Sequence, residues 1–323
     1  MMILNKIGHI LKDYDDFAIV SHVSPDGDSI GSMLGLFNTL KDFGKSVDLF
    51  VDDILPEKYS FLTGYDNIKR YNTGSKYSCL IILDCGDVLR LGELKSLLNC
   101  SDIVINIDHH ISNTLFGDVN YVDSNASSVG EIIYQILKIN GYNISKTTAM
   151  CLYTSILTDT GGFKYSNTTS MTFNIVGDLI NTGINFSDIY SRIYDSKTLS
   201  QTKLLEKVLS TLEVYFNDTV AVLTMPYKLL EECNAKENDA DEFINYARNI
   251  DTAEVGVFIK QINDFKCRVS LRSKNYVDVS KIAAYFNGGG HIRAAGCTIE
   301  GSISEAKNKI LDALKDVLEV GHK

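Results

Sequence analysis

Three short apolar runs in the first third of the chain each stop abruptly at polar residues. They are FAIVSHV at 17–23, CLIILD at 79–84 and DIVINID at 102–108. Strands that are apolar along almost their whole length are typical of a parallel sheet that helices cover on both faces. We therefore expect the chain to begin with an α/β domain, because an antiparallel sheet with one solvated face needs alternating polar residues.

The segments between these runs have the apolar periodicity of helices. The sequence predicts helices at 28–43, 128–137, 147–157 and 169–179, and a further strand at 46–51. This alternation predicts an open, doubly wound, mostly parallel sheet. Ligands of such sheets bind at the carboxyl ends of the strands, where this sequence places His22, Asp84 and Asp108.

The character of the sequence changes after residue 212. Asn217-Asp218 and Asn263-Asp264 each separate two short apolar segments, as in β-hairpins, and helical patterns follow at 279–286 and 304–318. These features indicate a smaller α+β domain. We predict an N-terminal domain at 1–190, a helical linker at 191–212 and the smaller domain at 213–323.

The net charge of −10 argues against a binder of long duplexes, which contact many phosphates through Lys and Arg. A few cationic side chains and bound metal ions still suffice for a short nucleic acid. The seven cysteines form no C-x-x-C pair, which disfavours a zinc finger or a disulfide framework. No apolar run approaches the ~20 residues of a membrane helix, and the first residues are amphipathic, unlike a signal peptide. We expect a cytoplasmic protein without a membrane partner.

Four short motifs carry residue types that bind divalent metal ions. In the first two, His22, Asp26 and Asp28 surround a Pro-Gly turn after the first apolar run, and Asp84 ends the second run. Each has a structural alternative. Asp26 can begin the turn while Asp28 caps the following helix, and Asp84 can end an ordinary strand. Asp87, close behind, is more simply a helix cap.

The third motif is Asp108-His109-His110 and the fourth is Asp159 in LTDTGGF. Successive side chains at a strand end point in different directions, so one histidine can bind a metal ion while its neighbour reaches a substrate. Asp108 can orient a ligating histidine. The alternatives are a surface turn for the two histidines and a helix C-cap for Asp159.

Together the motifs supply carboxylate and imidazole ligands from distant parts of the chain: His22, Asp26, Asp28, Asp84, His109 and Asp159. Such a set suits a pair of ions roughly 3.5–4 Å apart. Oxygen and imidazole ligands favour manganese, magnesium or iron over a thiolate-preferring metal. Four aspartates at neighbouring strand ends would repel one another without cations. The sequence therefore predicts a two-metal site.

The motifs SHVSPDGDS, LDCGD, NIDHH and LTDTGGF resemble the four ordered motifs of the DHH phosphoesterase superfamily. The resemblance implies a catalytic domain at 1–190 with two divalent ions, Mn²⁺ first and Mg²⁺ or Co²⁺ as alternatives. One ion would be held by His22, Asp26 and Asp84. The other would be held by Asp28, Asp84, His109 and Asp159. The implied catalytic residues are His110, at the scissile phosphate or leaving group, and Asp108, which supports the histidines.

The segment NGGGHIRAAG at 287–296 resembles the glycine-rich signature of the DHH-associated nucleic-acid-binding domain. Glycines let backbone N–H groups approach a phosphate closely. The implied substrate-binding residues are Arg272, Gly288, Gly289, Gly290, His291, Arg293 and, in the first domain, Lys164. The chain departs from the pattern at two positions. Lys164 replaces a frequent arginine and loses its bidentate fork, and Asn287 stands where a fourth glycine is common.

The resemblance spans about residues 15–318 and is strongest to the small oligoribonucleases of the superfamily. It implies hydrolysis of RNA of a few nucleotides, of linear dinucleotides, and of 3'-phosphoadenosine 5'-phosphate to AMP. Another DHH phosphohydrolase, either a pyrophosphatase or a single-strand exonuclease, and a non-catalytic nucleotide- or RNA-binding protein are the alternatives. A homodimer is left open. SVGE at 128–131 matches a helix capping box, which we prefer to a phosphate site there.

Overall fold

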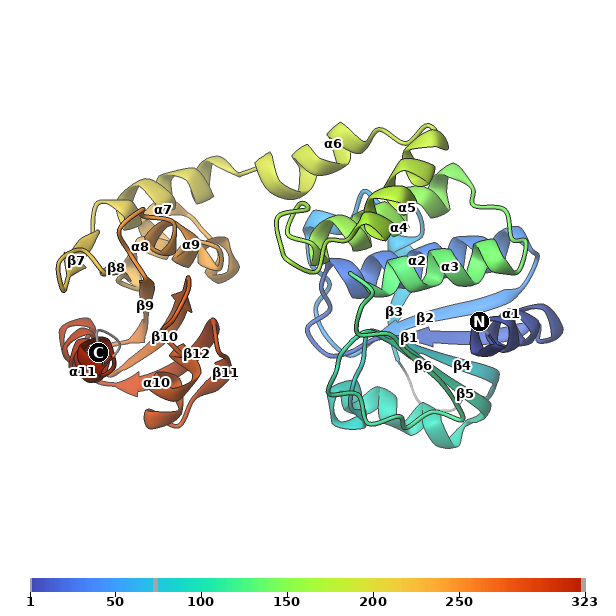
Figure 1. The fold of residues 1–323 in the computed structure, drawn as a ribbon, viewed down its shortest axis with the longest axis horizontal. Coiled ribbons are helices and arrows are strands. Elements are labelled where there is room, and N and C mark those ends of the chain that lie inside the picture. Colours follow the sequence, from blue (N-terminus) through green and yellow to red (C-terminus); the bar gives the residue numbers. More distant parts are fainter. Residues whose placement is uncertain (1, 72–74, 321–323) are drawn as a thin grey trace. The chain divides into compact units, whose positions relative to one another are not determined.

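The computed structural model describes residues 2–71 and 75–320. The chain divides into two compact units, Met1–Ser196 and Lys197–Lys323. The division falls inside the stretch that the sequence predicted as a helical linker. Figure 1 shows a sheet with helices in each unit, and each unit is described by itself below.

The N-terminal unit is built on a six-stranded sheet of order β3-β2-β1-β4-β5-β6 in which all neighbours are parallel. Its strands are β1 Asp16–Val20, β2 Ser46–Val51, β3 Ile68–Arg70, β4 Tyr77–Leu83, β5 Ser101–Asp108 and β6 Val119–Val122. The predicted α/β fold is confirmed. Strand order runs outward from the centre in both directions, so the sheet has a topological switch point between β1 and β4.

The register aligns the carboxyl ends of the three central strands. Val20 pairs with Ile82, and Leu83 pairs with Ile107. His22, Asp84 and Asp108 therefore leave the sheet at the same edge.

Helices cover both faces of this sheet (Figure 1). The helices of this unit are α1 Met2–Asp13, α2 Gly27–Asp42, α3 Val129–Ile139, α4 Lys146–Asp159, α5 Ser170–Asn181 and α6 Phe186–Tyr190. The unit also has the 12-residue segment η3 Val88–Asn99 and the short turns η1 Glu57–Tyr59, η2 Tyr65–Asn67 and η4 Ser191–Asp195. Phe17 and Ile19 pack into the large core with α1 to α5, whereas Ala18 and Val20 pack against η3. This two-sided burial is the reason that β1 is apolar at every one of these positions.

Two glycines bring α2 and α4 into close contact. A Cβ at Gly31 would lie 2.6 Å from the Cys151 carbonyl oxygen, and one at Gly35 would lie 2.5 Å from a methyl carbon of Leu152. Any larger residue would push the helices apart, because real Cβ atoms do not approach this closely. The contact matters for the site, since α2 begins near Asp28 and α4 ends at Asp159.

The C-terminal unit has a mixed six-stranded sheet of order β11-β12-β10-β9-β8-β7. Its strands are β7 Glu213–Tyr215, β8 Val220–Met225, β9 Val255–Asn263, β10 Lys266–Ser273, β11 Gly289–His291 and β12 Ala294–Glu300. Its helices are α7 Leu199–Leu209, α8 Lys228–Cys233, η5 Glu237–Ala240, α9 Ile244–Arg248, α10 Val279–Tyr285 and α11 Ile303–Val320. Both predicted hairpins are present and antiparallel, whereas β8 and β9 pair in parallel.

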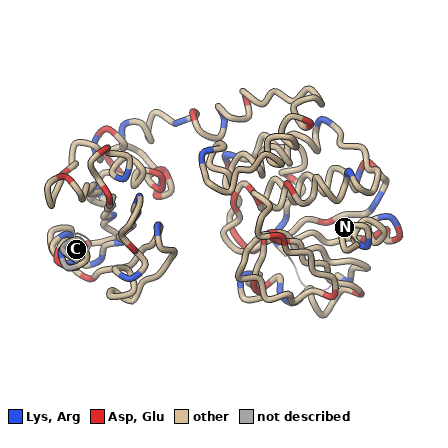
Figure 2. The backbone as a smooth tube through the Cα atoms, viewed as in Figure 1, with Lys and Arg blue, Asp and Glu red and all other residues tan. Residues whose placement is uncertain are grey.

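Charged residues are distributed over both units. Figure 2 shows Lys and Arg scattered along the tube and interspersed with Asp and Glu. Within the described residues, no helix combines the length and the apolar character that a membrane span requires.

Glu254 is a buried carboxylate that holds the turn before α10. It is 4% exposed and accepts hydrogen bonds from the backbone N–H groups of Asn275, Tyr276 and Val277 at 2.8–3.0 Å. Burial raises the pKa of Glu254, but these hydrogen bonds outweigh burial and leave the pKa lowered.

Glu254→Gln is expected to destabilise the C-terminal unit by about 2 kcal/mol at pH 7, because it weakens several charge-assisted hydrogen bonds. A lowered carboxyl pKa stabilises the fold above the unfolded-state pKa, and this stabilisation is lost as pH falls through the folded-state pKa. The difference between wild type and variant should therefore shrink in acid. Thermal unfolding midpoints of both proteins at neutral and acidic pH measure this difference in stability. Glu242→Gln serves as the control, because Glu242 is exposed. A thermal midpoint of Glu254→Gln equal to that of wild type at pH 7 would contradict the expectation.

Candidate metal centre and active site

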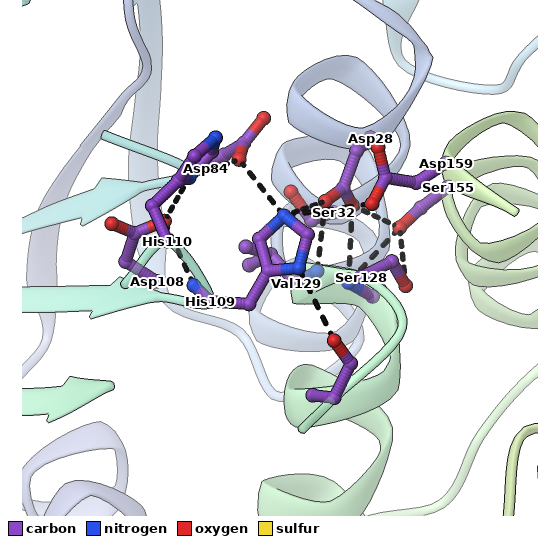
Figure 3. Close-up of polar contacts among 12 residues, drawn as sticks. Asp28, Ser32, Asp84, Asp108, His109, His110, Ser128, Val129, Ser155 and Asp159 are labelled. Carbon is purple, nitrogen blue, oxygen red and sulfur yellow. Dashed lines mark hydrogen bonds and ion pairs between the residues drawn. The ribbon is translucent and has the colours of Figure 1, made fainter. Parts of the chain in front are cut away.

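Three overlapping groups of side chains meet at the carboxyl ends of β1, β4 and β5. Figure 3 shows Asp28, Asp84, His109, His110 and Asp159 among them. In each group the ligand atoms lie within 4.8 Å of one another and come from segments far apart in the sequence. The groups are Asp84-His109-His110, His22-Asp26-Asp84 and Asp28-His109-Asp159. All six residues expected to hold metal ions are therefore brought together by the fold. His110 joins them.

Asp84 lies at the centre of this arrangement. It follows β4 with φ of 57° and is 2% exposed. Its Oδ2 is 3.3 Å from His22 Nε2, and its Oδ1 is 3.8 Å from His109 Nε2 and 3.6 Å from His110 Nδ1. Asp84 Oδ1 is nevertheless buried without a hydrogen-bond partner. A buried oxygen of this kind is costly unless a cation binds it.

Backbone carbonyls orient the two histidines that face the carboxylates. His22 Nδ1 lies 2.6 Å from its neighbour's carbonyl at Val23, and His109 Nδ1 lies 3.2 Å from the carbonyl of Ala126. If each Nδ1–H donates to its carbonyl, Nε2 is the atom left to bind a metal ion. Burial lowers the pKa of His22, which favours the neutral, ligating form.

Asp28 is held by the beginning of a second helix. Its carboxylate accepts hydrogen bonds from Val129 N–H at 2.8 Å, from Gly130 N–H at 3.3 Å and from the Ser155 hydroxyl at 2.5 Å. Figure 3 shows Asp28 beside Ser128 and Ser155. The N-terminus of α3 therefore points at a residue 101 positions earlier.

Asp26, and not Asp28, caps α2. Asp26 Oδ1 accepts from the backbone N–H groups of Asp28 and Ser29, both at 3.0 Å. The alternative in which Asp28 was the cap is wrong, because Asp28 already lies inside the first turn. Asp87 caps η3 through Leu89 N–H at 2.7 Å, as expected.

Asp159 is the last residue of α4, and Thr160 is its C-cap. Gly161 and Gly162 follow with φ of 57° and 71°, a conformation that favours glycine. Asp159 thus ends a helix and also lies in the cluster, with Oδ2 3.5 Å from His109 Nε2.

The carboxylates of the cluster disfavour one another's ionisation. Burial raises the pKa of Asp28 to about 6. Burial, followed by repulsion from Asp28 and Asp26, raises the pKa of Asp159 to about 8. The same two causes raise the pKa of Asp84 well above its usual range. Hard divalent cations would remove this penalty, so both the ligand types and the electrostatics fit bound metal ions.

Asp108 orients His110 through a hydrogen bond to its ring. Asp108 is fully buried, and its Oδ1 lies 2.7 Å from His110 Nδ1. Asn113 Nδ2 donates to Asp108 Oδ2 at 2.6 Å and to Asn106 Oδ1 at 2.8 Å. The hydrogen bond to Asp108 raises the pKa of His110. Asp108 Oδ1 also accepts a hydrogen bond from the backbone N–H of His109 at 2.8 Å, but not from the His109 ring.

The glycine-rich segment forms a tight hairpin between β11 and β12. A Cβ at Gly288 would lie 2.3 Å from the Gly296 oxygen, and one at Gly290 would lie 2.4 Å from the Ala294 oxygen, so these glycines permit the close approach of the two strands. Gly289 faces open space and His291 is exposed. Gly289 itself pairs with Gly296 of β12.

The cationic residues expected to bind substrate have different surroundings. Arg293 donates to the backbone carbonyls of Val277, at 2.8 Å, and of Asn275. Arg293 therefore braces the turn that Glu254 also holds. Arg272 is partly exposed on β10, and Lys164 is exposed after the two glycines.

Sequence reasoning did not find the residues that hold the ligands in place. These are Ser155, the N–H groups of Val129 and Gly130, the carbonyl of Ala126, and Asn113. One signal was present. Ser128 was expected to begin a helix and does cap α3, with Glu131 N–H donating to its hydroxyl at 3.1 Å. The Glu131 carboxylate instead accepts from Ser127 Oγ at 2.7 Å.

Comparison with known proteins gives consistent matches over both units. The model of the DHH family, N-terminal domain, matches residues 16–156, and that of the DHHA1 domain matches residues 217–320. A Thermus thermophilus protein named bifunctional oligoribonuclease and PAP phosphatase NrnA is 31% identical, covering 93% of this chain and 89% of the relative. The Bacillus subtilis protein of the same name is 29% identical, covering 88% and 90%.

A solved structure matches the whole chain. An exopolyphosphatase-related protein from Bacteroides fragilis superposes with a TM-score of 0.92 at 28% identity, covering 100% of this chain and 98% of that one.

Proposed function

The chain belongs to the DHH family of phosphoesterases and carries a DHHA1 domain, and from this premise we propose that it hydrolyses short oligoribonucleotides and 3'-phosphoadenosine 5'-phosphate with two Mn²⁺ ions. The observation that carries the proposal is the buried Asp84 Oδ1, which has no hydrogen-bond partner although His109 and His110 lie within 3.8 Å. An oxygen in this position suits a ligand shared between two cations.

The six clustered residues would hold the ions in two sets that share Asp84. One set is His22, Asp26 and Asp84, and the other is Asp28, Asp84, His109 and Asp159. Bound ions would lower the pKa of a water molecule and polarise the phosphoryl oxygens. Oxygen and imidazole ligands without thiolate suit Mn²⁺, Mg²⁺ or iron, and the resemblance to the DHH phosphoesterases puts Mn²⁺ first. The near neighbour Cys85 is fully buried and faces the η3 core, away from this set.

The chain's own residues supply the proton transfer. His110 Nδ1–H donates to Asp108, which leaves Nε2–H to donate to the leaving oxygen as the P–O bond breaks. The oxygen of water forms the new bond to phosphorus, and the proton that this water loses passes to solvent. The hydrogen bond to Asp108 raises the pKa of His110, which favours its imidazolium form. Asp108 remains ionised, since Asn113 and His110 both donate to it.

The C-terminal unit supports a short nucleotide substrate. A cavity of 590 Å³ on its sheet is lined by residues of β10, β12 and the glycine-rich segment, among them Lys266, Arg268, Phe286 and Gly288. Cations and an aromatic ring in one cavity suit a phosphate and a base. The relatives named as oligoribonuclease and PAP phosphatase share both domains with this chain, which favours this substrate class over pyrophosphate.

Turnover with Mn²⁺ should be compared on an RNA dinucleotide, 3'-phosphoadenosine 5'-phosphate, pyrophosphate and an RNA of about 24 nucleotides, longer than the roughly 4–16 nucleotides of a compact single-strand site. We expect AMP from 3'-phosphoadenosine 5'-phosphate, nucleoside monophosphates from the dinucleotide, and far slower turnover of the other two. Preferred hydrolysis of pyrophosphate would identify a pyrophosphatase. Binding of the dinucleotide without turnover of any substrate would identify a binding protein.

Asn113→Ala is expected to lower kcat by about 10–100-fold, the usual effect of losing a residue that orients an active-site group. Asn113 holds Asp108, which holds His110, so Mn²⁺ affinity should change little. Steady-state kinetics and Mn²⁺ titration measure both quantities. Thr114→Ala is the matched control, because Thr114 bonds only the Gly86 carbonyl. Wild-type kcat in Asn113→Ala would show that Asp108 needs no such support.

A further inference from the structure

Arg90 lies beside the metal centre but has no role among the residues described so far. It is an exposed residue of η3, and its Nη2 lies 3.0 Å from His22 Nδ1. His22 Nε2 in turn lies 3.3 Å from Asp84 Oδ2. Arg90 therefore borders the residues that are expected to hold metal ions.

The guanidinium of Arg90 and the Val23 carbonyl both lie within hydrogen-bond distance of His22 Nδ1, and the tautomer of His22 decides which of them is the partner. When His22 binds a metal ion through Nε2, its Nδ1 carries the proton and donates to the Val23 carbonyl at 2.6 Å. Nδ1 then has no lone pair for Arg90. Among the described residues, no carboxylate forms an ion pair with Arg90. In this metal-bound state none of the five N–H donors of Arg90 has an acceptor among the described residues.

The backbone holds Arg90 firmly in this position. Val23 N–H donates to the Arg90 carbonyl at 2.8 Å, and Glu93 N–H donates to Asp52 Oδ2 at 2.8 Å. Between them Gly92 adopts φ of 58° and ψ of −131°, and a Cβ there would lie 2.2 Å from Asp52 Oδ2. η3 is thus fastened to the loops after β1 and β2. A residue fixed in this way is arranged before the substrate arrives.

We propose, on the basis of the phosphoesterase function above, that Arg90 is a phosphate-binding residue whose guanidinium donates hydrogen bonds to a non-bridging oxygen of the scissile phosphate. A guanidinium is suited to this role because its planar N–H groups match phosphate oxygens and it stays charged at every relevant pH. It also offsets the build-up of negative charge that the phosphate adds to a site rich in carboxylates.

The test is titration of the Mn²⁺-loaded full chain with inorganic phosphate by calorimetry. Arg90→Gln should weaken phosphate binding on the order of tenfold or more, the loss expected for charge-assisted hydrogen bonds. Arg90→Lys should be intermediate, because it keeps the charge and loses the fork. Lys95→Gln is the matched control, since Lys95 is an exposed cation of the same η3 segment, and it should bind phosphate like wild type.

Mn²⁺ affinity and the thermal midpoint, measured on the same variants, separate this role from a structural one. Both should equal those of wild type. Wild-type phosphate affinity in Arg90→Gln would overturn the proposal, as would a parallel loss of Mn²⁺ affinity, which would assign Arg90 to holding His22. If Arg90→Gln does not fold, Arg90→Lys decides alone. If wild type hydrolyses no substrate, the proposed function is wrong. The phosphate titration then still tests whether Arg90 binds phosphate.

Discussion

Asp84→Asn is expected to reduce turnover by at least about 10³-fold, because a shared metal ligand contributes several kcal/mol to the transition state and each 1.4 kcal/mol is tenfold. The amide keeps the shape of the side chain and offers a single, neutral ligand oxygen. Mn²⁺ affinity should fall together with turnover. Steady-state kinetics with saturating Mn²⁺ and a calorimetric Mn²⁺ titration measure both losses.

The same substitution should raise the stability of the metal-free protein. Burial and neighbouring aspartates raise the pKa of Asp84 well above its usual range. A raised carboxyl pKa means that ionisation destabilises the fold, and this destabilisation grows as pH rises above the unfolded-state pKa. Metal-free Asp84→Asn should therefore have a higher thermal midpoint than metal-free wild type at pH 8. Mn²⁺ should reverse the order, since it stabilises the state that binds it.

Asp87→Asn is the matched control for Asp84→Asn. Asp87 lies three residues away and caps η3 through a hydrogen bond to Leu89 N–H. Asparagine also caps helices well, so turnover and the response to Mn²⁺ should match wild type. Full activity of Asp84→Asn, or an unchanged Mn²⁺ affinity, would remove Asp84 from the metal centre.

The fold of the N-terminal unit could be predicted because burial on both faces of the sheet requires apolar residues along each central strand. Phe17 and Ile19 face one core and Ala18 and Val20 the other, so β1 had to be apolar throughout. Strand order could not be predicted in this way. β3 has only three residues, Ile68–Arg70, and two of them are exposed, so no pattern marks it as an edge strand.

The residues expected to bind metal ions could be singled out because each lies near the end of a strand or helix that the sequence already indicates, and the structure brings them together. The residues that position them could not, since their contacts join segments far apart. Ser155 and Asp28 are 127 positions apart, and Val129 and Asp28 are 101 apart. Arg293 was expected at the phosphate and donates to two backbone carbonyls instead.

His110→Gln is expected to lower kcat by about 10²–10⁴-fold, the usual contribution of general acid catalysis, with Mn²⁺ affinity nearly unchanged. His110 Nδ1 is engaged by Asp108 at 2.7 Å, so the imidazole donates through Nε2 and holds no ion in this assignment. Its pKa is raised by that hydrogen bond. Because the protonated form is the donor, wild-type kcat should fall as pH rises through this pKa. The variant should lack that decline.

The pH profile distinguishes a proton donor from a metal ligand. A ligand would lose Mn²⁺ affinity on substitution and leave the pH dependence of the remaining activity in place, whereas a donor would do the reverse. His9→Gln is the matched control, because His9 is exposed on α1, away from the carboxyl ends of the strands, and should have wild-type kcat at every pH. A high-pH decline of kcat that persists in His110→Gln would assign the proton transfer to another group.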